Sequence, residues 1–417
     1  MSSGPSGLGR DELALLVPEY LLAGHLIDRA GMPHLIGAFG RDVMRDVAIA
    51  EWMGASPVYT RRIQRALGFG GDSVETIFKG MQFDVGAPPQ FMDFRYRVTD
   101  RDHGEFWLDH CGALMDVEPM GPDYVVAMCH DIEDPTFEAT AAATNPQARV
   151  RPIHRPPRVP ADRTPHCLWT VTIDDDNPAL PFPAEAEAMS RTRAATWELA
   201  PIDPGDPGQH DYEGPLVADL RFSDWSASAL RRIVDEVCLQ GHLLVLSFVA
   251  AVQERADAAT ALEVARRQFT GVAGVTADRF RDALGLPPTM EGAARLLALH
   301  PGLQPYDYVR CDVELADRVR LRLQRDTGAG TDGAWPAMLD GDHLSPLDAM
   351  VRAIDPHFHC VAVSDGDALV VEVVRGQNET SVPDDVVLTR FSTGTTFTFE
   401  DRGTPIELRT GGRDGGS

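Results

Sequence analysis

Apolar residues recur at helical spacing in four long stretches of the chain. One pair covers residues 11–30 and 39–67, and the other covers residues 225–254 and 258–284. Apolar side chains three and four positions apart fall on one face of an α-helix, and Pro and Gly residues follow the second stretch of each pair. The pattern therefore predicts two pairs of helices, one pair in each half of the chain.

Shorter stretches alternate between apolar and polar residues, as half-buried β-strands do. Two such stretches follow each helix pair, and two more strands with a helix between them are predicted in the first half. The strands cover residues 94–98, 104–109, 124–128, 168–173, 308–313 and 317–323, and the helix covers residues 135–144. The order predicts an α+β fold of two duplicated domains, each an N-terminal helical part followed by a small, mostly antiparallel sheet with one packed helix.

Four short matches in the same order indicate that the two halves are copies of one domain. The first two lie at a shift of 217 residues, the third at 214 and the fourth at 210, a drift that short deletions explain. The matches are Gly24-His25 with Gly241-His242, Ala66-Leu67-Gly68 with Ala283-Leu284-Gly285, Asp93-Phe94 with Asp307-Tyr308, and residues 137–146 with 347–356.

The duplication divides the chain into four segments. Residues 1–175 form the first copy, and residues 216–400 form the second. Residues 176–215 are rich in Pro, Gly and Asp, which is typical of a linker. One or two hairpins are expected after Arg375, and the polar tail at 401–417 is expected to be disordered.

The charge of the chain limits its partners. The net charge is −25 and the isoelectric point is near 4.8, whereas a nucleic-acid backbone requires clustered Lys and Arg. No run of 18 apolar residues and no signal-peptide pattern is present, which predicts a soluble, cytoplasmic protein without a membrane partner. Lys79 is the only lysine among 38 basic residues, a bias typical of a GC-rich bacterial genome.

Cysteine and histidine residues are concentrated between positions 110 and 167. The cluster consists of His110-Cys111, Cys129-His130-Asp131, His154 and His166-Cys167. Thiolate and imidazole are the ligands that zinc and iron accept, and no Cys-x-x-Cys pair points to a compact structural zinc site. The cluster therefore predicts a catalytic zinc or iron centre, with Cys111, Cys129, His154 and Cys167 as ligands.

Neighbouring polar residues supply the remaining roles of such a centre. His130 or Asp131 would move the proton, with Glu133 as a further acid or base. Arg155 and Arg158 lie on a Pro-rich stretch and could hold a substrate carboxylate or phosphate.

The second copy lacks this cluster. At a shift of 214, His110-Cys111 corresponds to Gln324-Arg325, and at the later shift of 210 His343 lies opposite Glu133. If Cys111 served only for packing, we would expect an apolar residue at the equivalent position of the second copy. The polar residues Gln324 and Arg325 there favour a function for Cys111. We expect an active first domain and a degenerate second one.

Two other interpretations of the cluster remain open. One cysteine could be a nucleophile activated by a histidine on another strand, because strand neighbours such as Cys129 and His130 point to opposite faces. Alternatively, the cysteines are small buried hydrophobes. His25 and His242 recur in both halves, which favours a structural role for them.

The first half resembles the L-2-amino-thiazoline-4-carboxylic acid hydrolase-like family. Cys111, Cys129, the stretch 137–146 and Cys167-Leu168-Trp169 carry the resemblance, which covers residues 11–173 and, more faintly, 225–374. It implies an α+β fold and hydrolysis of a carbon–nitrogen bond in a small heterocycle or amide-like substrate by Cys, His and acidic residues. The tandem arrangement, the His130-Asp131 pair and the stretch 154–158 depart from the family pattern and put the substrate in doubt.

Together these features predict a zinc- or iron-dependent enzyme, a hydrolase, that acts on a small-molecule substrate in the first domain. A metal of this kind lowers the pKa of bound water so that hydroxide attacks carbon. The alternatives are a non-haem iron oxidoreductase with the same ligands and a small-molecule-binding protein without turnover. A homodimer is also possible.

Overall fold

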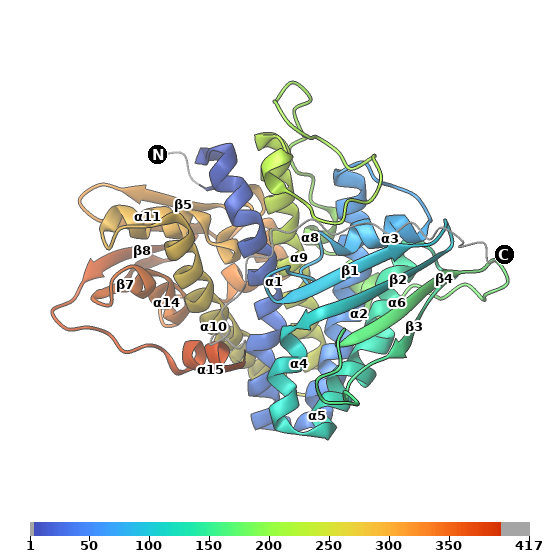
Figure 1. Ribbon diagram of the computed structural model, residues 1–417. Helices are drawn as coiled ribbons and strands as arrows, with labels where there is room; N and C mark the ends of the chain where they lie inside the picture. The colour runs from blue at the N-terminus through green and yellow to red at the C-terminus, as the bar shows by residue number, and fades with distance from the viewer. Residues whose placement is uncertain (1–3, 393–417) are drawn as a thin grey trace, which may run out of the picture.

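The computed structural model describes residues 4–392, and it has an α+β fold with two sheet-bearing domains, as predicted (Figure 1). Long helices occupy the centre, and one four-stranded sheet lies on each side of them. The central helices are α1 (Arg10–Phe39), α2 (Arg41–Ala66), α9 (Ala227–Gln253) and α10 (Ala258–Leu284). The two helix pairs begin 217 residues apart, which confirms the shift read from the sequence.

The central helices of the two halves pack against each other. Helix α2 lies along α9, and α1 lies along both α10 and α9. Gly31 on α1 allows close approach, because a Cβ there would meet the Phe248 ring of α9 at 2.7 Å. The two halves therefore share one continuous hydrophobic core.

The two sheets have the same antiparallel topology. The first has the order β1-β2-β4-β3, and the second has the order β5-β6-β8-β7. Their strands are β1 (Met92–Val98), β2 (His103–Cys111), β3 (Ala148–His154), β4 (Cys167–Ile173), β5 (Cys311–Leu315), β6 (Val319–Gln324), β7 (Phe358–Asp365) and β8 (Ala368–Arg375). Strand β3 contains Pro152, which obscured it in the sequence and which an edge strand tolerates.

Shorter helices surround this framework. They are α3 (Val74–Met81), α4 (Gly112–Val117), α5 (Pro122–Val126), α6 (Glu133–Thr144), α7 (Ala184–Met189), α8 (Arg193–Thr196), α11 (Met290–Leu299), α12 (Tyr306–Val309), α13 (Gly328–Asp332), α14 (Ser345–Ile354) and α15 (Asp384–Ser392). Single 3₁₀ turns cover Pro5–Gly7, Glu118–Met120, Phe222–Asp224, Pro301–Leu303 and Trp335–Met338.

Sheet register corrects one of the four sequence matches. Phe94 pairs with Leu108 in the first sheet, and the equivalent pair in the second sheet is Cys311 with Leu323. Phe94 therefore corresponds to Cys311, and the match to Tyr308 was wrong, because Tyr308 lies in α12 before the strand begins. Two short segments can have similar residues although the hydrogen-bonding pattern of the two sheets does not place them at equivalent positions.

The prediction of a strand at residues 124–128 was also wrong. These residues form the end of α5 and the start of a π-helical turn, Ala127–Ile132, that continues into α6. A short apolar run does not distinguish a buried strand from a buried helix, and the Pro at the start of α5 favours the helix.

The predicted linker at 176–215 contains an element of the repeated fold. Helix α7 packs on α2 after the first sheet, as α15 packs on α10 after the second. Helix α15 also replaces the expected hairpin between Arg375 and residue 392. The rest of that prediction and the predicted disordered tail at 401–417 lie outside the described residues.

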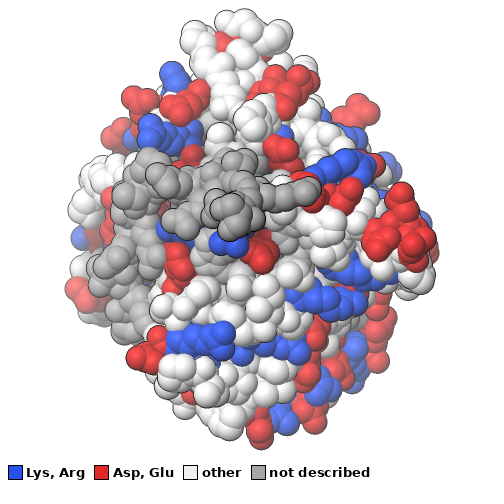
Figure 2. Space-filling model, turned by 45° about the vertical axis from the view of Figure 1, so that its right-hand side comes forward, with Lys and Arg blue, Asp and Glu red and all other residues white. Residues whose placement is uncertain are grey.

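Helix α9 is long and apolar enough to span a membrane by length and composition. However, 83% of its most apolar window is buried inside the protein, which is compatible with the core helix of a soluble protein. On the face shown in Figure 2, acidic and basic side chains of the described residues are interspersed.

Candidate active site

The predicted metal ligands come from four elements of the first half. Cys111 ends β2, Cys129 lies in the π-helical turn, Cys167 begins β4 and His154 ends β3. The three thiols are buried and interact electrostatically with one another, whereas His154 is only partly buried. Within residues 4–392, no group of three or more His, Cys, Asp or Glu side chains is arranged to hold a metal ion. The zinc or iron centre therefore stays a prediction.

The Cys111 thiol has a structural partner. Its Sγ accepts a hydrogen bond from the Leu114 backbone N–H at 3.4 Å and so caps α4. Thr327 does the same for α13, where its Oγ1 accepts from Gly330 N–H at 3.0 Å. By this role Thr327 is the counterpart of Cys111, and the expected counterpart Arg325 was wrong. A shared capping function explains why a polar residue replaces Cys111.

Burial dominates the chemistry of the other two thiols as well. Cys167 pairs with Leu108, and the equivalent position opposite Leu323 is Leu369, an apolar residue. Burial, followed by the charge of Glu133, raises the pKa of the Cys129 and Cys167 thiols, and burial raises the pKa of Cys111 to about 12. All three are protonated at neutral pH, which does not favour the thiolate nucleophile considered from the sequence.

The other predicted residues hold the surface of the first half together. His130 Nε2 lies 2.7 Å from the Pro156 carbonyl, and Asp131 lies 3.7 Å from Arg45. Arg155 pairs with Asp134, and Arg158 forms a two-pronged contact with Glu118 at 2.7 and 3.0 Å. Of the predicted site residues, only Glu133 lines the cavity described next.

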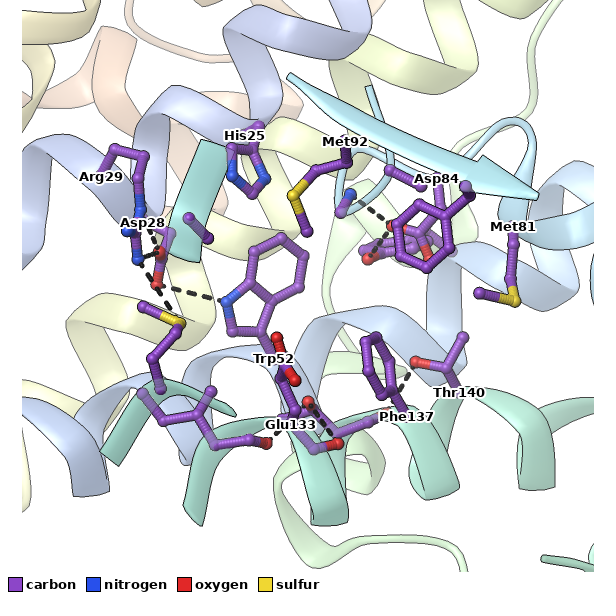
Figure 3. A pocket seen from close by; sticks show the side chains of 18 residues that line it. His25, Asp28, Arg29, Trp52, Met81, Asp84, Met92, Glu133, Phe137 and Thr140 are labelled. Carbon is purple, nitrogen blue, oxygen red and sulfur yellow. Dashed lines mark hydrogen bonds and ion pairs between the residues drawn. The ribbon is translucent and has the colours of Figure 1, made fainter. Parts of the chain in front are cut away.

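A cavity of about 90 Å³ lies between the helices and the sheet of the first half (Figure 3). Its walls come from α1, α2, the segment from α3 to β1, and the turn that leads into α6. The lining residues are His25, Asp28, Arg29, Trp52, Tyr59, Met81, Asp84, Gly86, Ala87, Met92, Phe94, Ala113, Met128, Ile132, Glu133, Thr136, Phe137 and Thr140.

Glu133 is a buried carboxyl group in this lining. The residue is 8% exposed, and its Oε2 has no hydrogen-bond partner among the described residues. Burial raises its pKa to about 8, with a smaller upward contribution from Asp134, while Arg155 and Arg29 oppose the shift. Glu133 is therefore largely protonated at pH 7 and can donate a proton.

Asp84 is the second carboxyl group, and it has a different environment. Its Oδ1 accepts hydrogen bonds from the Tyr59 hydroxyl and from Gly86 N–H, both at 2.7 Å. Burial raises its pKa to about 6, and these two hydrogen bonds limit the shift. Asp84 is therefore largely ionised at pH 7, and both of its hydrogen bonds go to the same oxygen.

A polar chain holds the indole of Trp52 in the cavity. Trp52 Nε1 donates to Asp28 Oδ1 at 3.2 Å, and the other Asp28 oxygen accepts from Arg29 at 2.7 and 3.0 Å. Arg29 also lies 3.7 Å from Asp116. The ring of Trp52 lies centrally between His25, Asp84 and Glu133 in Figure 3.

His25 differs from its counterpart in the second half. Neither of its ring nitrogens makes a hydrogen bond of normal geometry within residues 4–392, and burial lowers its pKa to about 4. His242, at the equivalent position, has its Nε2 2.7 Å from the Gln304 carbonyl. The recurrence of this histidine suggested one structural role for both, whereas only His242 has a bonded partner.

The polar lining is confined to the first half. At the helical shift of 217, Asp28 and Arg29 correspond to Val245 and Leu246, and Trp52 corresponds to Phe269. Phe269 stacks on Trp335 with ring centroids 4.5 Å apart. The charged pair within the buried stretch 20–32 of α1, replaced by apolar residues in the copy, was the sequence signal that could have located this cavity.

No protein-family model, curated protein or solved structure matches this chain at a significant level.

Proposed function

We propose that the cavity is the active site of an enzyme that hydrolyses a small heterocyclic or amide-like substrate. The observation that carries this proposal is the pair Glu133 and Asp84, two carboxyl groups that line one cavity and have opposite protonation states at pH 7. Carboxyl groups whose pKa values are separated by their surroundings are typical acid and base partners.

The two groups divide the chemistry of hydrolysis between them. The Asp84 carboxylate accepts a proton from a water molecule as that water attacks the electrophilic carbon. The Glu133 carboxyl donates its proton to the departing nitrogen. Trp52, Phe94 and Phe137 line the space for the apolar body of the substrate. These steps use only the acid and the base, and a dependence on zinc or iron remains a separate prediction.

A small-molecule-binding protein without turnover is the second candidate. The Oε2 atom of Glu133, which has no hydrogen-bond partner among the described residues, favours it, because a bound polar molecule would satisfy this atom without any reaction. For either function we place the protein in the cytoplasm, where its six free and buried cysteines would stay reduced.

Hydrolysis of a panel of cyclic amides, amidines and thiazolines, followed by mass spectrometry for the addition of water, tests the proposal. Glu133→Gln and Asp84→Asn should each lower kcat at least about 100-fold, the usual contribution of a general acid or base. The matched control is Glu138→Gln on the same helix, whose carboxylate pairs with Arg151 outside the cavity. Saturable binding without turnover would support the second candidate, and full activity in Glu133→Gln would exclude the assigned acid.

A further inference from the structure

The charges around the cavity point to the class of molecule that it accepts. Asp28 and Asp84 supply carboxylates to the lining and Glu133 supplies a neutral carboxyl group, and among the described lining residues Arg29 is the single permanently cationic one. Arg29 is already bonded to Asp28 through two nitrogens and lies 3.7 Å from Asp116. A ligand carboxylate would therefore have to compete with two protein carboxylates for the same guanidinium.

The two arginines that the sequence predicts to hold a substrate anion do not change this balance of charges in the lining. Arg155 and Arg158 lie outside the lining, and each is paired with a carboxylate, Asp134 and Glu118 respectively. The described lining of the cavity therefore supplies no uncommitted cation for a substrate carboxylate.

Asp84 is placed to receive a hydrogen-bond donor. Tyr59 and Gly86 both donate to Oδ1, so Oδ2 has no protein donor within residues 4–392. The ring edge of Trp52 lies beside the same carboxylate, because a Cβ on Gly86 would meet Asp84 Oδ1 at 3.0 Å and Trp52 Cζ3 at 3.3 Å. Any side chain at position 86 would crowd both the carboxylate and the ring, and glycine avoids this contact.

We propose that the cavity selects a small flat molecule with a protonated nitrogen group, such as an amine or amidine, which donates to one lone pair of Asp84 Oδ2 near Trp52 and leaves the other lone pair for the attacking water. The cationic group gains from the Asp84 carboxylate, which pairs with it, and the flat body of the ligand packs against the aromatic lining of the cavity. The inference rests on the proposed function, since it names the substrate class of that same site.

Two isosteric probes test the charge preference directly. Benzamidine and benzoate have the same flat shape and opposite charge, and their binding to the full chain can be measured by titration calorimetry at pH 7. We expect benzamidine to bind at least about tenfold more tightly than benzoate, a difference of about 1.4 kcal/mol. Equal affinity, tighter binding of benzoate, or saturable binding of neither probe would overturn the inference.

Variants locate the preference at Asp84. Asp84→Asn should fold, because its Oδ1 can still accept from Tyr59 and Gly86, and it should lose at least about tenfold in benzamidine affinity. The control is Asp307→Asn, an exposed carboxylate in the second half. Unchanged benzamidine affinity in Asp84→Asn would contradict the inference, and thermal unfolding of both variants checks that they remain folded.

The outcome is separable from that of the proposed function. A preference for benzamidine without hydrolysis of any panel compound supports the substrate class and contradicts the hydrolase. Hydrolysis that needs Asp84 and Glu133, without the preference, supports the hydrolase and contradicts the substrate class.

Discussion

Arg62 of the first half and Glu236 of the second half form a buried ion pair, with Nε–Oε2 and Nη2–Oε1 distances of 2.9 and 3.1 Å. The residues at the equivalent positions, Arg279 and Glu19, form the same pair in reverse. Reciprocal contacts of this kind are typical of a two-fold interface between identical subunits. The two copies therefore meet within one chain as the subunits of a symmetric dimer would.

Arg62→Ala should destabilise the protein more than Arg279→Ala. Removing Arg62 leaves Glu236 almost fully buried with only Arg232 as a partner, whereas Glu19 and Arg279 are more exposed. Breaking one partner of a buried pair costs about 3 kcal/mol or more. Urea unfolding of both variants measures the difference, and equal losses would show that burial of the first pair does not matter.

The pH dependence of hydrolysis should be bell-shaped. Activity requires ionised Asp84 and protonated Glu133, so kcat/KM should rise as the pH passes about 6 and fall as it passes about 8. The measurement is kcat/KM for a turned-over panel compound across this range, with a folding check at each pH. A rate that still rises above about pH 9 would contradict the role of Glu133 as the acid.

Glu133→Gln should change how stability depends on pH. In the folded wild-type protein the carboxyl keeps its proton up to a pKa of about 8, whereas the unfolded chain releases it near the usual value of 4.5. The stability that comes from burying the neutral form is complete below about pH 4.5 and declines by up to about 1.4 kcal/mol per pH unit until pH 8.

Glutamine has no proton to lose, so the stability of Glu133→Gln relative to the wild type should rise between pH 5 and pH 8. Urea unfolding at several pH values measures this change, and Glu138→Gln provides the control because its carboxylate pairs with Arg151. Parallel stability curves for Glu133→Gln and the wild type would show that the pKa of Glu133 is not raised.

Cys111→Ser separates the capping role of Cys111 from the predicted metal-binding role. A serine hydroxyl can accept the Leu114 N–H bond as Thr327 does in the second half, so we expect activity within about twofold of the wild type and unchanged stability. Elemental analysis of both proteins is the decisive measurement. Stoichiometric zinc or iron that is lost in Cys111→Ser, together with activity, would support the metal centre instead.

The sequence predicted the framework well where the signal was local or repeated. Helical spacing located the four central helices, and the shift of 217 matched their starting residues. It failed at residues 124–128, where five apolar residues fit a strand or a buried helix equally well. It also missed β3, because Pro152 is acceptable only on the edge strand that the tertiary structure creates.

Composition pointed to the half of the chain that contains the cavity, and most of the residues that it selected lie outside the cavity lining. The Cys and His cluster drew attention to residues 110–167, and of its chemistry only the nearby Glu133 lines the cavity. His25, Asp28 and Asp84 were missed or assigned to structure, because no short motif joins residues so far apart in the sequence.

The sequence by itself determined the duplication, the helices and most strands, since these depend on residue periodicity and on repeats along the chain. Only the tertiary structure decided which polar groups lie together and which carboxyl groups keep their protons. The physical reason is that a pKa depends on burial and on neighbours in space. Asp84 and Glu133 acquire their different protonation states from residues on other helices and loops, which no local pattern records.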